Sequence, residues 1–168
     1  EDVAAAAHRG VQDLPRADAL AQHLARRGPR APPHEVPPPQ RERVFFNGLG
    51  GFTPDGREYV ISLAPGETTP APWVNVIANS RIGTVVSESG GATTWVENAH
   101  EFRLTPWHND PVSDPSGEAF YIRDEESGQF WSPTPLPAPG AGAHVCRHGF
   151  GYSVFETTQL GISSELWT

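Results

Sequence analysis

Short runs in which apolar residues alternate with polar or small ones fill most of the chain after Val44. In Tyr59-Val60-Ile61-Ser62-Leu63, the bulkiest apolar side chains stand at every second position, as they do in a strand with one buried face. Because many such runs follow one another with Gly and Pro between them, the pattern predicts a mainly β chain, folded as a sandwich or barrel. The other predicted strands are 44–46, 73–78, 83–87, 92–96, 118–123, 129–132, 144–147, 152–157 and 161–166.

The pattern before Val44 is different and predicts short α-helices followed by a spacer. Residues 3–14 are rich in Ala, and residues 17–27 place Leu20 and Leu24 one helical turn apart. Residues 29–39 hold six prolines in eleven positions, which favours an extended, semi-rigid segment. The sequence therefore divides into linker helices (1–28), a Pro-rich spacer (29–43) and a β domain (44–168).

Glycine-rich turns punctuate the β domain. Asp55-Gly56 is a hairpin signal, and residues 124–128 predict a turn between two pairing strands. The glycines at 47–51 are not followed by a helix, which argues against a phosphate-binding loop.

Charge and composition exclude several classes of function. The formal net charge is -8, which disfavours nucleic acid and anionic membranes as partners. All twelve basic residues are arginine, so a Schiff-base lysine and a P-loop lysine are both absent from this chain. No apolar run approaches the length of a membrane span, and a single cysteine permits no internal disulfide. These features fit a reducing compartment and predict a cytoplasmic location without membrane insertion.

The segment Thr105–Val112 carries the most distinctive chemistry. Pro106 and Pro111 each fix a backbone φ and remove a donor, so the segment is predicted to be a rigid loop. A flat indole at Trp107 beside Asn109 and Asp110 suits a sugar, whose C–H face stacks on the ring while amide and carboxylate take the hydroxyls. The alternative is a tight turn in which the indole fills the core and the polar groups satisfy local backbone donors.

Metal and nucleophilic chemistry are less well supported. His144, Cys146 and His148 alternate on a predicted strand, but positions four apart lie roughly 13 Å from each other, whereas zinc–ligand bonds are only about 2.0–2.3 Å long. A serine hydrolase built on Ser89 and His148 lacks the nucleophile elbow. The sequence therefore predicts no catalytic serine, no metal site and no bound cofactor.

Carboxylates and arginines remain as candidates. A glycosidase needs two carboxylates at a set distance, and the sequence alone does not give the distance between any two acids. The candidate acids are Glu88, Glu101, Asp110, Asp124 and Glu125. Arg103, Arg123 and Arg147 each stand beside aromatics or glycines, where a guanidinium can clamp hydroxyls or phosphate. The alternative for each arginine is a structural ion pair with a nearby acid.

Seven segments, taken in order, resemble one known family. The sequence is similar to the start of the phosphorylase-type module of cyclic β-1,2-glucan synthases, in glycoside hydrolase family 94 (earlier glycosyltransferase family 36). The resemblance covers roughly residues 44–168 and rests on Asn47–Phe52, Thr69–Asn79, Val86–Gly90, Arg103–Val112, Tyr121–Glu125, Phe130–Thr134 and Arg147–Tyr152.

The resemblance implies a fold and a role. In this family a β-supersandwich of the galactose-mutarotase-like type precedes a helical barrel that holds the catalytic acid. This chain ends before any barrel, so we expect an incomplete, non-catalytic part of a β-1,2-glucan-processing protein, with no catalytic residue assigned here. The resemblance further implies a barrel partner, a possible homodimer and a parent protein at the inner membrane.

The residues expected nearest a β-linked glucan are Trp107, Asn109, Asp110, Arg123, Arg147 and His148. Two alternatives stay open. The chain could be a free-standing carbohydrate-binding module, or a structural oligomerisation domain without sugar binding.

Overall fold

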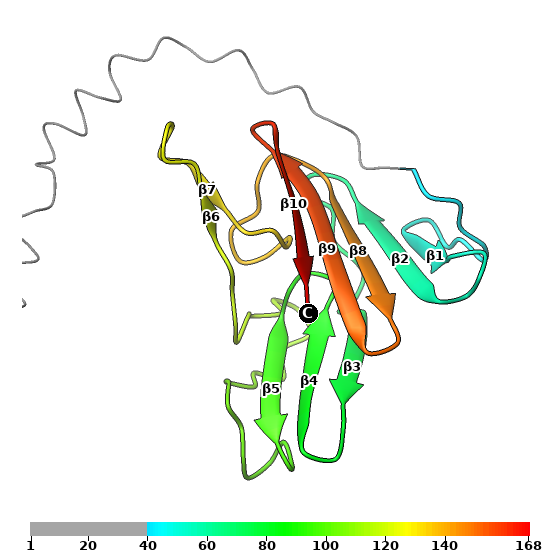
Figure 1. Ribbon diagram of the computed structural model, residues 1–168, viewed down its shortest axis with the longest axis vertical. Coiled ribbons are helices and arrows are strands. Elements are labelled where there is room, and N and C mark those ends of the chain that lie inside the picture. The colour runs from blue at the N-terminus through cyan, green and yellow to red at the C-terminus, as the bar shows by residue number, and fades with distance from the viewer. Residues whose placement is uncertain (1–39) are drawn as a thin grey trace, which may run out of the picture.

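The computed structural model describes residues 40–168, and within this range ten strands form three antiparallel sheets (Figure 1). The mainly β, antiparallel fold is thus confirmed. The predicted helices at 1–28 and nearly all of the predicted spacer lie outside the described residues.

The largest sheet has five strands in the order β1-β2-β8-β9-β10. Its centre is the hairpin formed by β8 and β9, and its edges are β1 and β10. The strands span β1 (Gly50–Phe52), β2 (Glu58–Leu63), β8 (His144–Gly149), β9 (Tyr152–Gln159) and β10 (Ile162–Trp167).

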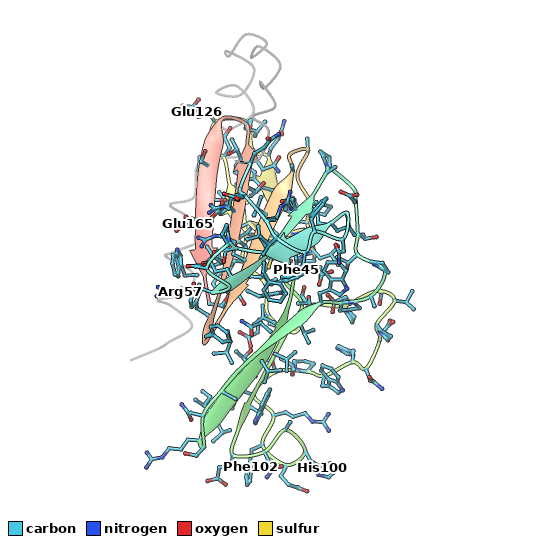
Figure 2. The ribbon with its side chains drawn as sticks, turned by 90° about the vertical axis from the view of Figure 1, so that its right-hand side faces the viewer. Phe45, Arg57, His100, Phe102, Glu126 and Glu165 are labelled. Atoms are coloured by element: carbon cyan, nitrogen blue, oxygen red, sulfur yellow. The ribbon has the colours of Figure 1, made fainter. Side chains whose placement is uncertain are left out.

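A second sheet consists of β3 (Val74–Ala78), β4 (Ile82–Ser87) and β5 (Ala92–Val96), in that order. In Figure 1 it extends below the five-stranded sheet, while the hairpin of β6 (Ile122–Arg123) and β7 (Phe130–Trp131) stands at the other end. Figure 2 accordingly places Glu126, in the turn of that hairpin, and His100, beyond β5, at opposite ends of the long axis.

The hydrophobic core lies where the end of β4 meets the middle of the five-stranded sheet. Ile61, Cys146 and Phe155 stand directly opposite one another on β2, β8 and β9, so their side chains share one face. Val86 of β4 packs against them from the second sheet. Burying apolar side chains of this size stabilises the fold by about 1.5–3 kcal/mol each.

Asn75 on β3 ties the two sheets together by hydrogen bonds. Its amide nitrogen donates to the backbone oxygens of Gly149 and Tyr152, both at 2.9 Å, in the tight connection between β8 and β9. The small sheet is therefore fixed to the large one at the same end as the core.

Most strand predictions are confirmed within a residue or two, and three elements differ. The strand predicted at 118–123 is reduced to Ile122–Arg123, β6. Residues 44–46 form only an isolated bridge, Val44 to Phe52, because Phe45 takes a φ of 54° that ends any extended run. The sequence pattern predicts no strand in the glycine-rich stretch after Asn47, yet Gly50 and Gly51 pair with β2 as part of strand β1. A Cβ at Gly50 would meet the Tyr59 ring at 2.7 Å, so the missing side chain allows this pairing.

Candidate functional site

The Thr105–Val112 loop leaves the edge of β5 and folds back over the small sheet. Thr94 on β5 fixes its start: the Thr94 carbonyl accepts the Leu104 amide at 2.9 Å, and the Thr94 amide donates to the Thr105 hydroxyl oxygen at 2.7 Å. The two prolines then prevent the loop from continuing the sheet, as the sequence predicts.

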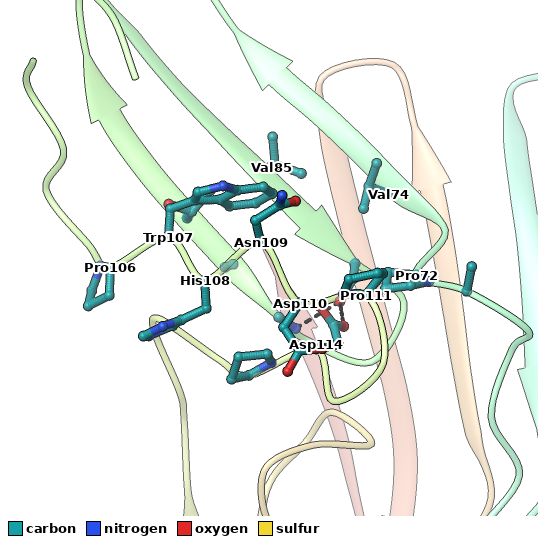
Figure 3. Close-up of a pocket in the computed structure, with 16 residues that line it drawn as sticks. Pro72, Val74, Val85, Pro106, Trp107, His108, Asn109, Asp110, Pro111 and Asp114 are labelled. Carbon is teal, nitrogen blue, oxygen red and sulfur yellow. Dashed lines mark hydrogen bonds between the residues drawn. The ribbon is translucent and has the colours of Figure 1, made fainter. Parts of the chain in front are cut away.

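The loop and the small sheet enclose a pocket of about 230 Å³ (Figure 3). Its floor is formed by strand residues such as Val85, and Trp107 lies across that floor with its side chain 52% exposed. The opposite wall comes from the segment before β3, through Ala71 and Pro72. The pocket is thus mainly apolar, with an accessible aromatic face.

The polar groups of the loop divide into free and occupied ones. Within residues 40–168, the side chains of Asn109 and His108 make no hydrogen bond, and Figure 3 shows the amide of Asn109 beside the indole while His108 points away from it. Asn109 is therefore the side-chain amide best placed for a ligand on Trp107.

Asp110 holds its own turn. One carboxylate oxygen accepts the Val112 and Ser113 amides at 3.0 and 3.2 Å, and the other accepts the Ser113 hydroxyl. The hydrogen bond from Ser113 is the main reason that the pKa of Asp110 lies below its ordinary value. This is the local capping role that the sequence left open as the alternative.

Asp114 fastens the far end of the loop to the turn between β4 and β5. Its Oδ2 accepts hydrogen bonds from Ser87, at 2.5 Å, and from Ser89. Sequence reasoning missed Asp114, which has no motif of its own. The one feature of the sequence that could have pointed to Asp114 is its position as an acidic residue just after a loop flanked by prolines.

Glu88 lies between those two serines in the sequence and is 3% exposed. Its side chain points toward the pocket wall formed by the segment before β3. Its carboxylate accepts the Thr69 hydroxyl and, at 2.7 Å, the Trp73 amide. Burial away from water is the main cause that raises the pKa of Glu88.

Arg147 lies on the outer face of the five-stranded sheet, away from the pocket. It is buried, and its guanidinium donates to Glu58 at 2.5 Å and to Glu156 at 2.8 Å. Glu156 also accepts two hydrogen bonds from Arg41, at 2.7 and 2.8 Å. The structure thus gives Arg147 the ion-paired arrangement that was the alternative to sugar contact.

His148 lies on the inner face of the same strand, since neighbouring strand residues point to opposite sides. Its Nε2 donates to the Trp73 carbonyl at 3.0 Å, so its Nδ1 accepts the Ser153 hydroxyl at 2.9 Å. Burial lowers the pKa of His148, which keeps the ring neutral in this tautomer. His148 therefore contacts the pocket only indirectly, through the backbone of Trp73.

Arg123 stands on the exposed side of β6, opposite Phe130 and 3.5 Å from a carboxylate oxygen of Glu125. Of the six residues predicted to lie near a sugar, Trp107, Asn109 and Asp110 line one pocket, whereas Arg123, Arg147 and His148 do not.

Neither a metal centre nor a membrane span emerges from residues 40–168. No group of three or more His, Cys, Asp or Glu side chains in this range is placed to hold an ion. No helix in this range is long and apolar enough to cross a bilayer.

Comparison with known proteins decides the family. Residues 57–168 match the family model described as the supersandwich domain of glycosyl hydrolase 94. The chain belongs to glycoside hydrolase family 94.

Curated relatives agree with this assignment. The chain is 47% identical over 116 residues to the cyclic β-(1,2)-glucan synthase NdvB of Rhizobium meliloti (strain 1021), covering 68% of this chain and 4% of that protein. It is 34% identical over 116 residues to the N,N'-diacetylchitobiose phosphorylase of Vibrio furnissii, covering 67% and 14% of the two chains. Identity to the solabiose phosphorylase of Paenibacillus borealis is 33% over 129 residues, which cover 70% of this chain and 15% of the relative.

The family 94 match begins within the described part of the chain and includes every strand from β2 onward. The chain spans 4–15% of the length of these relatives, so what is shown for it is the supersandwich domain.

Proposed function

We propose that this supersandwich domain is a non-catalytic, sugar-facing part of a protein resembling cyclic β-1,2-glucan synthases, and that its Trp107 pocket contacts a β-linked glucan. Glycosyl transfer or phosphorolysis would then belong to a barrel domain of the parent protein. The proposal extends to the domain helping to frame the sugar site and a dimer interface in that parent.

The observation that carries the proposal is the exposed indole of Trp107 beside the unbonded amide of Asn109 in an otherwise apolar pocket. An indole face stacks on the C–H face of a pyranose, and an amide both donates to and accepts from hydroxyls. A volume of about 230 Å³ suits a small part of a sugar chain rather than a long oligosaccharide.

The acids of the pocket support a non-catalytic role. General acid–base work needs a carboxyl group within hydrogen-bond reach of the reacting proton. Both carboxylate oxygens of Asp110 accept hydrogen bonds from the chain itself, and Oδ2 of Asp114 accepts the hydroxyls of Ser87 and Ser89. These contacts give both acids a structural part in supporting the pocket.

Calorimetric titration of the chain with linear β-1,2-gluco-oligosaccharides tests the proposal. We expect saturable binding that Trp107→Ala abolishes, while the free energy of unfolding falls by only about 1–2 kcal/mol because about half of the indole is exposed. Phe102→Ala, which removes an exposed aromatic outside the pocket, is the matched control and should bind as the unmodified chain does. Equal affinity of the chain and Trp107→Ala would contradict the proposal.

Self-assembly without sugar binding is a second candidate function. It is favoured by β10, an edge strand of the large sheet that ends in the exposed indole of Trp167. Light scattering that shows a defined dimer, together with no sugar binding, would favour this candidate over the first.

A further inference from the structure

The turn between β4 and β5 sends its side chains toward both walls of the pocket. Ser87 and Ser89 reach one carboxylate, that of Asp114, whereas Glu88 between them reaches Thr69 and Trp73. One three-residue sequence thus contacts the loop that carries Trp107 and the segment that carries Pro72.

The wall of the pocket formed by the Trp107 loop depends on Asp114. This residue follows the Trp107 loop, lines the pocket itself and takes a φ of 41°, a conformation that non-glycine residues rarely adopt. Hydrogen bonds to a charged acceptor are stronger than those between two neutral groups. The two serine hydroxyls therefore have the strength to hold this conformation and the loop before it.

Gly91 is an independent sign that the chain makes room for this contact. A Cβ built on Gly91 would lie 2.6 Å from Oδ1 of Asp114 and 2.9 Å from its Cγ. The Gly91 amide also donates to the Ser87 hydroxyl oxygen at 2.9 Å, which orients that hydroxyl toward Asp114. A side chain at position 91 would thus push the carboxylate off the two serines.

The opposite wall, formed by Ala71 and Pro72, depends on Glu88. Its bonds to Thr69 and to the Trp73 amide bracket Ala71 and Pro72, the two residues between them that line the pocket. The Trp73 carbonyl is held from the core side by His148 and by the Glu88 amide, at 3.0 and 3.2 Å. The wall is therefore fixed from both directions.

We propose that Glu88 and Asp114, joined through Ser87 and Ser89, are positioning residues that set the distance between the two walls of the Trp107 pocket. A pyranose stacked on the indole fits only while the Pro72 wall and the Trp107 loop keep their separation. The choice of ligand rests on the proposed function above, but the geometry of the walls can be measured with no sugar present.

The test uses four variants of the full chain. Asp114→Ala removes the acceptor, Gly91→Ala displaces it without changing it, and Asp114→Asn keeps an oxygen acceptor of the same shape. Val112→Ala is the control, because Val112 lies on the same loop, is 93% exposed and does not line the pocket.

The first readout is NMR of the sugar-free protein, using the Trp107 indole N–H signal and the contacts between the indole and the Val85 methyls. Asp114→Ala and Gly91→Ala should shift the signal and weaken the contacts, while Asp114→Asn should restore most of both. The second readout is affinity for a β-1,2-gluco-oligosaccharide, which we expect to fall about tenfold in Asp114→Ala and Gly91→Ala and to stay unchanged in Val112→Ala.

Unchanged indole signals and contacts in Asp114→Ala and Gly91→Ala would overturn this inference. If Asp114→Ala does not fold, the Gly91→Ala and Asp114→Asn pair decides the same point. Shifted indole signals in a chain that binds no sugar would leave the positioning role standing and overturn the proposed function alone.

Discussion

At the scale of single residues, what a polar side chain can bind depends on whether the chain itself already occupies its hydrogen-bonding groups. Asn109 and Asp110 are neighbours in the same pocket, yet only the amide is free within the described residues, because both carboxylate oxygens accept hydrogen bonds from Val112 or Ser113. The two positions therefore differ: the amide of Asn109 is available to a ligand, whereas the carboxylate of Asp110 holds the loop.

Substitution should separate these two parts. Asn109→Ala should weaken binding of β-1,2-gluco-oligosaccharides about tenfold, the effect of one good hydrogen bond, without changing the urea midpoint of unfolding. Asp110→Ala should weaken binding as well, but through disorder of residues 110–113, seen as faster amide hydrogen exchange there. Identical exchange in Asp110→Ala and the unmodified chain would refute the capping role.

His144 gives a pH dependence of stability. Burial is the main cause that lowers the pKa of His144 from 6.5 to about 4. A histidine whose folded pKa is depressed contributes stability that is present above pH 6.5 and is lost as the pH falls toward 4. The loss at pH 4 is on the order of 3 kcal/mol.

Urea unfolding of the chain and of His144→Gln at pH 7.0 and pH 4.5 measures this contribution. The unmodified chain should lose more stability than the variant on acidification, since glutamine does not titrate. His148 shifts in the same direction but is present in both proteins, so the difference isolates His144. Parallel losses in the two proteins would show that His144 does not control acid stability.

At the scale of elements, the alternation of apolar and polar residues located most strands. It did not show which face of each strand lies near the pocket. Arg147 and His148 are adjacent on β8 and were grouped as one candidate site, yet they lie on opposite faces of the sheet. The prolines did predict the rigid loop, because they fix φ whatever packs around them. Its docking onto Ser87 and Ser89 is a long-range contact that no local pattern contains.

The ion-pair network on the outer face of the large sheet is an element-scale feature with a measurable contribution. Glu156→Ala leaves the buried guanidinium of Arg147 with Glu58 alone and should cost on the order of 3 kcal/mol. Arg41→Ala removes a partner that is one-third exposed and should cost about 1 kcal/mol or less. Equal costs in urea titrations would contradict the different roles of the two partners.

At the scale of the whole molecule, the chain is a supersandwich domain of family 94 in which one turn braces a small apolar pocket. The core at the junction of the sheets and the bonds of Asn75 keep the pocket on a rigid support. The pocket is one local structure, and the outer ion-pair network and the β6–β7 hairpin are separate from it.

The measurement that tests the central claim most directly is an NMR titration of the chain with linear β-1,2-gluco-oligosaccharides, with β-1,4-linked chains as the control. The account predicts saturable shifts of the Trp107 indole and the Asn109 side-chain amide, with no comparable shift at Trp167 on the outer face of the sheet. Well-dispersed spectra in which neither the Trp107 nor the Asn109 signal moves at saturating sugar would contradict it.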